Sequence, residues 1–295
     1  MTTVNPHWAK RARERPWQQV RITPALYAGP TRDIERAIRP LTDAGAVRLD
    51  DGRGNQLIIS TDGRIRLGLE PEGGDVMGKV AVHERPFRPP LWTVSLTENT
   101  PIEVVEAITT ELADRLRTGR RLTGGAADDE WRTPLQAHGW TLIWDAAAGT
   151  ETAFAEQSPQ DRIVLNTQAV LDPDEWEEAG QEGFWSVDIA GDFDGWSAAA
   201  SICTPDQILH TMVSAMLAPA IRDIGDLGDL AVGAAVVGAA ELTEIPSSPT
   251  PLDTHRARAA RTTSPTRAAA DSTRIAFSAS APFSQPASGP GPRYR

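Results

Sequence analysis

A segment that occurs twice constrains the fold of this chain more than any other feature. Trp92 and Trp196 lie 104 residues apart, and each is followed eight positions later by a Thr-Pro pair. Behind each pair the apolar residues recur at helical spacing, as Val104, Val105, Ile108 and Leu112 and again as Ile208, Leu209, Met212 and Met216. The pattern predicts two copies of one module, each closed by a helix that buries the same face.

Each Thr-Pro pair has the features of a helix N-terminus. A threonine N-cap, a proline at the first helical position and a glutamate or glutamine three residues after the cap together make a capping box. The three positions are Thr100, Pro101 and Glu103 in the first copy and Thr204, Pro205 and Gln207 in the second. We therefore expect the caps to determine where both closing helices begin.

Strands and short helices are predicted upstream of each closing helix. Residues 40–45 and 134–139 read as short helices that end at a glycine in the left-handed conformation. Alternating apolar residues predict strands at 92–96, 140–144 and 185–189, and Asp62-Gly63 predicts a hairpin between 56–60 and 64–69. A second hairpin is predicted between 151–156 and 162–166. We expect most tryptophans in these strands to pack in the core.

The predicted fold class is α+β, with two tandem copies of an antiparallel meander and a closing C-terminal helix, followed by a disordered C-terminal tail. The predicted segments are a basic N-terminal segment (1–19), the first module (20–118), a linker (119–127), the second module (128–222), an Ala/Gly-rich helix or linker (223–245) and the tail (246–295). The tail is rich in Pro, Ser and Thr, which favours disorder. It also carries seven arginines against two aspartates, so that the formal charge of −11 becomes −16 for the remaining 245 residues.

Several short motifs resemble the actinobacterial SPDY-domain family, a domain of unknown function that often occurs in tandem. They span roughly residues 20 to 222. The matching residues are Pro24, Leu26, Ala28-Gly29-Pro30, Leu41, Ala44-Gly45, Leu135, Gly139-Trp140, Ser158-Pro159, Trp196, Thr204-Pro205, Ala218-Pro219 and Arg222. The naming motif is altered, because Ser158-Pro159-Gln160-Asp161 and Ser60-Thr61-Asp62-Gly63 stand where Ser-Pro-Asp-Tyr would. The resemblance implies the fold and the duplication, and it implies no activity.

The sequence predicts no catalytic residue, no cofactor site and no metal site. Cys203 is the only cysteine and has no histidine close to it, and the five histidines are scattered. Asp188, Asp192 and Asp194 do not continue into a complete calcium-binding loop. The single cysteine, the absence of an apolar leader and the absence of a long apolar run favour a cytoplasmic protein with no membrane contact.

We therefore expect a non-enzymatic binding or scaffold protein with a partner surface at the junction of its two modules. The partner is expected to be a protein, and a homo-oligomer is an alternative. Two loops are candidate interaction sites because their charges are opposite, with Arg85 and Arg88 in the first copy and Asp174, Glu175, Glu177 and Glu178 in the second. One rival is a nucleic-acid-associated regulator that binds weakly through its arginine-rich tail. The other is an enzyme with an unrecognised site between the modules.

Overall fold

The computed structural model describes residues 10, 14, 17–30, 33–70, 78–123, 130–147, 150–154, 162–170, 182–189, 195–227, 231–232, 234–235 and 238–246. The tail that was predicted to be disordered (246–295) lies outside this part of the chain, apart from residue 246. The acidic residues at 174–178 also lie outside it. Residues 1–247 form one compact unit.

One order of elements occurs twice along the chain, a helix followed by five antiparallel strands and a second helix. In the first half these are α2 (Glu35–Asp43), β2 (Val47–Asp50), β3 (Gln56–Ile59), β4 (Ile65–Leu69), β5 (Gly78–His83), β6 (Pro90–Leu96) and α3 (Ile102–Thr118). In the second half they are α4 (Arg132–Ala137), β7 (Thr141–Asp145), β8 (Thr150–Phe154), β9 (Arg162–Val170), β10 (Glu182–Ile189), β11 (Trp196–Ser201) and α6 (Asp206–Leu217). The mixed α+β fold class is confirmed.

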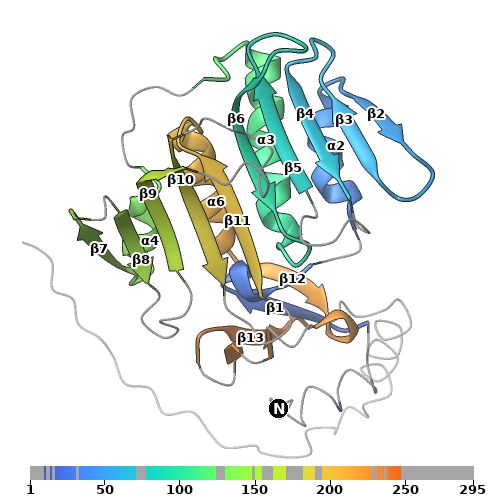
Figure 1. Ribbon diagram of the computed structural model, residues 1–295. Helices are drawn as coiled ribbons and strands as arrows, with labels where there is room; N and C mark the ends of the chain where they lie inside the picture. The colour runs from blue at the N-terminus through green and yellow to red at the C-terminus, as the bar shows by residue number, and fades with distance from the viewer. Residues whose placement is uncertain are drawn as a thin grey trace, which may run out of the picture. The chain divides into compact units, whose positions relative to one another are not determined.

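The ten strands form a single sheet in the order β2-β3-β4-β5-β6-β11-β10-β9-β8-β7 (Figure 1). The two halves meet where β6 pairs with β11 in antiparallel register, with Ser95 opposite Ala199. These two residues also lie 104 positions apart, which is the spacing of Trp92 and Trp196. The β6–β11 pairing is therefore centred on two residues at the same spacing as the two tryptophans.

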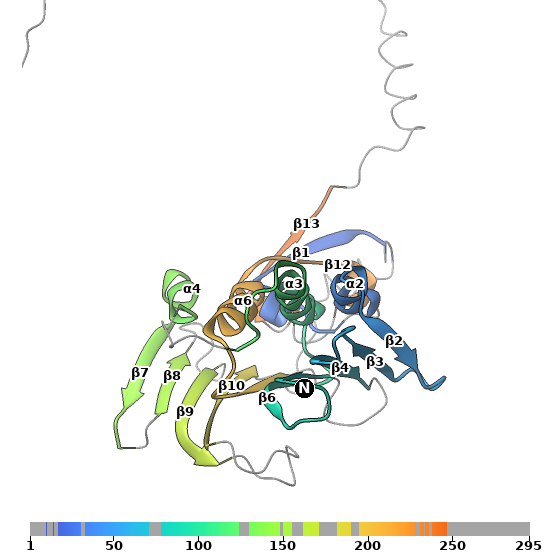
Figure 2. The ribbon, with the colours of Figure 1, turned by 90° about the horizontal axis from the view of Figure 1, so that it is seen from above.

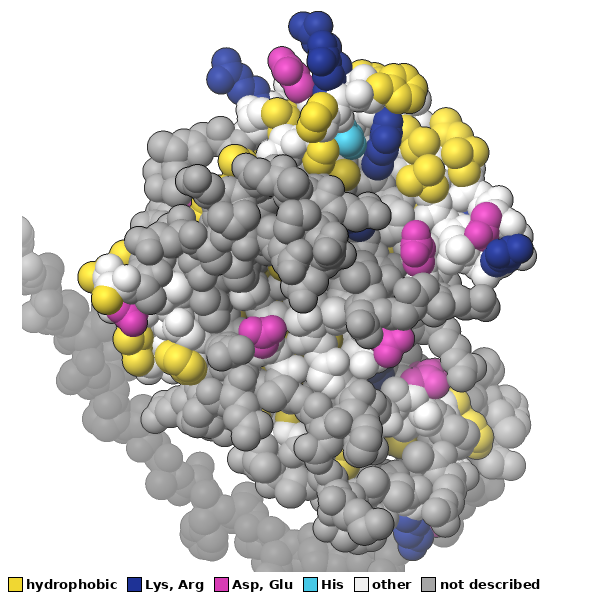
Figure 3. All heavy atoms as spheres, in the orientation of Figure 1, with side chains coloured by type: hydrophobic (Ala, Val, Ile, Leu, Met, Phe, Trp, Pro, Cys, Tyr) yellow, Lys and Arg dark blue, Asp and Glu magenta, His cyan; other side chains and the backbone are white. Residues whose placement is uncertain are grey.

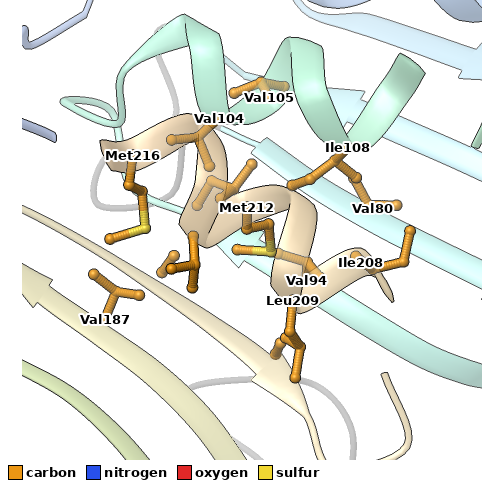
Figure 4. Close-up of a cluster of buried hydrophobic side chains, with 14 of the residues drawn as sticks. Val80, Val94, Val104, Val105, Ile108, Val187, Ile208, Leu209, Met212 and Met216 are labelled. Carbon is orange, nitrogen blue, oxygen red and sulfur yellow. The ribbon is translucent and has the colours of Figure 1, made fainter. Parts of the chain in front are cut away.

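Helices α2, α3, α4 and α6 cover one face of this sheet (Figure 2). Helices α3 and α6 pack against each other over the central strands (Figure 4). The predicted faces of both helices are buried, from Val104 to Leu112 and from Ile208 to Met216. Such a face drives helix formation because it removes apolar surface from water.

Two buried tryptophans, one in each half of the chain, hydrogen-bond to segments outside the large sheet. Trp92 Nε1 donates a hydrogen bond to the carbonyl of Leu122 at 2.7 Å, and Trp196 Nε1 donates one to the carbonyl of Leu26 at 2.8 Å. Buried indole N–H groups need such acceptors. The predicted core positions at 92, 140, 185 and 196 are confirmed, but Trp144 is 56% exposed, because β7 is the outermost strand of the sheet.

A small second sheet joins the two ends of the compact unit. It has the order β12-β1-β13, from β1 (Gln19–Thr23), β12 (Ala220–Asp223) and β13 (Glu241–Glu244). Two 3₁₀ helices adjoin it, η1 (Ala25–Tyr27) and η2 (Ile224–Asp226). Residues 223–245, which were expected to be helix or linker, contain helical residues at 231–232 and 234–235 and also a strand, β13. Strand β1 crosses the predicted boundary at residue 19. The predicted linker (119–127) contains a buried residue, Leu122.

The predicted capping boxes are wrong in detail. Helix α3 starts at Ile102 and α6 at Asp206, so Pro101 and Pro205 occupy the N-cap positions, and no side chain caps either helix. Glu103 and Gln207 become the second residue of each helix. The threonine hydroxyls do not cap the helices. Thr204 Oγ1 donates to the carbonyl of Thr93 at 3.3 Å, and Thr100 Oγ1 is buried with no hydrogen-bond partner among the described residues.

Candidate functional site

The loop between β5 and β6 carries the most exposed large apolar side chain among the described residues. Phe87 is 92% exposed, and its φ of 64° is the only positive φ outside glycine in that part of the chain. A bulky residue adopts the left-handed conformation only where its surroundings impose it. Arg85 and Arg88 flank it and are also exposed. The loop therefore presents an aromatic ring between two positive charges.

Three contacts hold this loop in place. The His83 Nδ1–H donates to the carbonyl of Arg88 at 2.6 Å, which closes the base of the loop. The guanidinium of Arg66, on β4, lies 5.6 Å from the centre of the Phe87 ring, within the range of a cation–π interaction. Pro86 rests on the β3–β4 turn so closely that a Cβ at Gly63 would lie 2.9 Å from its Cγ. The exposed ring is thus preorganised.

Positive charge is concentrated at the same end of the first half. The β3–β4 turn, the β5–β6 loop and the C-terminal end of α3 meet there, and Lys and Arg side chains gather at the top of the molecule in Figure 3. Residues 60–66, 83–88 and 111–121 contain eight arginines and only four acidic residues. Because the chain up to residue 245 carries a formal charge of −16, this basic end is a local exception to an acidic body.

A pocket of about 180 Å³ lies between the β3–β4 turn and the end of α3. Its charged lining consists of Asp62, Arg64, Arg115, Arg117 and Arg120. Burial raises the pKa of the Asp62 carboxyl, but hydrogen bonds from Ser60 and Arg64 outweigh it, so that the pKa is lowered. Asp62 is therefore ionised at neutral pH and paired with Arg64, whose Nε lies 2.7 Å away.

An ion cluster lies at the opposite end of α3. The buried Arg222 of β12 donates two hydrogen bonds to the carboxylate of Glu103, at 2.6 and 2.7 Å, and a third to the carbonyl of Gly29 at 3.1 Å. Arg36 of α2 bridges Glu103, at 3.1 Å, and Glu106, at 2.5 Å. These contacts join α2, α3 and β12, so this ion cluster of Arg36, Glu103, Glu106 and Arg222 has a structural role.

The ion cluster lowers the pKa of Glu103. Burial by itself raises this pKa, because a charged carboxylate is less stable away from water. The hydrogen bonds and charge of Arg222, with a further contribution from the charge of Arg36, outweigh burial. Glu103 was predicted as part of a capping box, and the structure assigns it to this cluster instead.

The structure describes only two of the predicted interaction residues. Arg85 and Arg88 lie in the exposed β5–β6 loop, as expected of a contact surface, whereas Asp174, Glu175, Glu177 and Glu178 lie outside the described residues. The sequence did not single out Phe87 or the arginines of the pocket. The prolines at 86, 89 and 90 indicate a stiff loop, but nothing local indicates a positive φ at Phe87.

Two kinds of feature are absent from the described residues. No helix there is long and apolar enough to cross a membrane. In the same part of the chain no three His, Cys, Asp or Glu residues come together in a way that could hold a metal ion. Cys203 is exposed.

Residues 59–116 match the family model of SPDY, a domain of unknown function (DUF317). The chain carries an SPDY domain. The SPDY match runs from the end of β3 through β4, β5 and β6 into the last turn of α3, so it contains Phe87 and Arg64. It is shorter than the span of the sequence resemblance and lies wholly in the first half. No curated protein and no solved structure matches the chain.

Proposed function

We propose that this protein is a non-enzymatic binding protein that holds an acidic segment of a protein partner on its SPDY domain. The binding surface consists of Arg66, Arg85, Phe87 and Arg88 and is called the Phe87 surface below. The observation that carries the proposal is the ring of Phe87, which is 92% exposed and held at a φ of 64°.

The energetic cost of this conformation supports a binding role. Leaving a phenylalanine in water forgoes about 1.5–3 kcal/mol of apolar burial. A left-handed backbone at such a residue costs roughly a further 1–3 kcal/mol. A partner that covers the ring recovers the free energy of apolar burial. The loop is already ordered before the partner binds, which reduces the entropy lost on binding. Phenylalanine and arginine are also enriched at the cores of protein interfaces, and arginine is among the commonest hot spots.

Charge determines the class of partner. Arg66 lies over the ring, and Arg85 and Arg88 flank Phe87 in the same exposed loop, so the complementary surface is acidic with an apolar side chain at its centre. A short acidic segment can bind within the basic end without meeting the acidic remainder of the chain. The partner surface that was expected at the junction of the two halves stays a prediction, because the described residues there form the β6–β11 pairing and the shared helix core.

Single-stranded nucleic acid is a second candidate, and Phe87 is the observation that favours it. An exposed aromatic ring among arginines can stack on a base, which contributes about 1–3 kcal/mol per base. A polynucleotide, however, extends over many phosphates, and beyond the basic end it would face the acidic body. We therefore place this function second.

Two further proposals concern the whole chain. The repeated element order, and the pairing of Ser95 with Ala199 at the repeat spacing, support an origin of the two halves as diverged copies of one module. A single cysteine that is exposed in the structure fits a reducing compartment, which supports a cytoplasmic location.

Fluorescence anisotropy with two labelled probes tests the proposed function. The probes are a 12-residue peptide of alternating Glu and Leu and a 12-nucleotide oligo-dT, each titrated with the full chain at two salt concentrations. Phe87→Ala should weaken binding of the peptide by about 30-fold, as the loss of a hot spot does. Trp144→Ala, which removes an exposed aromatic ring from β7, should leave binding unchanged.

The outcomes separate the candidates. Unchanged peptide binding by Phe87→Ala, or no binding by the parent chain, would refute the Phe87 surface. Tighter binding of oligo-dT than of the peptide, lost in Phe87→Ala, would favour the nucleic-acid function instead.

A further inference from the structure

The pocket between the β3–β4 turn and the end of α3 shares no residue with the Phe87 surface. Its volume of about 180 Å³ is several times what a single water molecule needs. Four of its lining residues are arginines and one, Asp62, is acidic. Such a concentration of guanidinium groups around one pocket is unusual in a chain whose body carries a formal charge of −16.

Ion pairs orient these guanidinium groups. Arg64 Nε contacts Asp62 at 2.7 Å, Arg115 Nε contacts Glu111 at 2.8 Å, and Arg117 Nη1 contacts Asp114 at 2.8 Å. Arg115 and Arg117 each donate one further hydrogen bond, to the carbonyls of Arg121 and Pro40, and Arg120 contacts Glu111 at 3.6 Å and Thr118 at 3.3 Å. A guanidinium has five N–H donors, so each of the four groups keeps donors beyond these contacts. The side chains of Arg64, Arg117 and Arg120 are 43%, 46% and 53% exposed, so their remaining donors can reach a ligand from solvent.

We infer that this pocket binds a phosphate-type oxyanion. A carboxylate is planar, and one bidentate arginine satisfies it. The pocket instead offers arginines from two directions, with Arg64 on the β3–β4 turn and Arg115, Arg117 and Arg120 at the end of α3. A tetrahedral phosphate accepts hydrogen bonds on several oxygens pointing in different directions, which matches this arrangement.

A purely structural role explains only part of the arrangement. Basic residues in the last turn of a helix stabilise its negative end, and Arg115 and Arg117 lie in the last turn of α3. Arg120 lies beyond the helix, which ends at Thr118, and Arg64 comes from another element. An interaction with the end of the helix therefore does not account for Arg64 and Arg120. Both side chains are exposed enough to be substituted without loss of the fold.

Isothermal titration calorimetry of the full chain tests the pocket. The probe is inorganic phosphate, with sodium chloride at matched ionic strength as the reference. We expect saturable binding of one phosphate. Arg64→Gln and Arg120→Gln should each weaken this binding by about tenfold, since each removes a charged hydrogen-bond donor. Arg53→Gln is the matched control, because Arg53 is exposed in the turn between β2 and β3 at the other end of these strands.

Phosphate can come from solution or from a phosphorylated residue of a partner. A phosphoserine peptide and its unphosphorylated counterpart distinguish the two sources: phosphorylation-dependent binding tighter than that of inorganic phosphate indicates the second, and equal affinity indicates the first. The inference is overturned if phosphate binds no better than chloride, or if Arg53→Gln weakens binding as much as Arg64→Gln. Phe87→Ala should leave phosphate binding unchanged, so failure of the pocket and failure of the Phe87 surface are distinguishable.

Discussion

Replacing Glu103 with glutamine removes the negative charge at the centre of the ion cluster while preserving the shape of the side chain. Arg222 then keeps its positive charge with its side chain only 3% exposed and without the carboxylate that receives two of its hydrogen bonds. Arg36 is less affected, because it keeps its contact with Glu106. The substitution therefore isolates the effect of an uncompensated buried charge.

The expected loss is large for a single polar substitution. Breaking a buried ion pair by removing one partner costs about 3–5 kcal/mol, because the remaining charge stays buried. The Glu103 side chain is 12% exposed and the amide can still accept one hydrogen bond, so we expect the lower end, about 3 kcal/mol. Glu106→Gln is the matched control, since it lies on the same helix with a side chain 37% exposed, and we expect about 0–1 kcal/mol there.

Urea unfolding, followed by circular dichroism at several pH values, measures both variants. The pKa of Glu103 is lowered in the folded state, so its contribution is fully present above the pKa of an unfolded glutamate, about 4.3. It is lost as the pH falls through the lowered folded-state pKa. The parent and Glu103→Gln should therefore differ at pH 7 and converge in acid. Equal losses for Glu103→Gln and Glu106→Gln at pH 7 would refute the structural role of the ion cluster.

Two further predictions concern pairs of related positions. Thr204→Val should lower the free energy of unfolding by about 1 kcal/mol through the lost hydrogen bond to Thr93, whereas Thr100→Val removes a buried hydroxyl with no partner among the described residues and should be neutral or stabilising. Thermal melts measure both, and equal losses would restore the N-cap interpretation. Gly63→Ala should cost more than Gly52→Ala, because both have a positive φ but only Gly63 would place a Cβ 2.9 Å from Pro86. If the two glycine variants melt alike, Pro86 does not rest on this turn.

The sequence predicts what depends on neighbouring residues and misses what depends on distant ones. The buried faces of α3 and α6, the hairpin at Gly63 and the helix ends at Gly45 and Gly139 follow local patterns, and all are confirmed. The pairing of β1 with β12 joins residues about 200 positions apart, for which the sequence has no local signal. In β12 the usual pattern is even reversed, because Arg222 is buried and Ile221 is 47% exposed. The burial of Arg222 is explained by its partners on other segments, the carboxylate of Glu103 and the carbonyl of Gly29.

The candidate sites belong to one half of the chain, and the proposed duplication shows why. At the repeat spacing of 104 residues, the positions of Arg115, Arg117 and Arg120 correspond to 219, 221 and 224, which are occupied by Pro, Ile and Ile. The second half therefore lacks the arginines of the pocket. Instead, the chain after α6 continues into β12, which pairs with β1 and places Arg222 on Glu103. If the two halves are diverged copies, the segment after the closing helix is an exposed basic end in the first half. In the second half the corresponding segment forms β12, which contacts α3 through Arg222. Since the pocket and the ion cluster lie at opposite ends of α3, we expect substitutions to alter stability and the proposed phosphate binding separately.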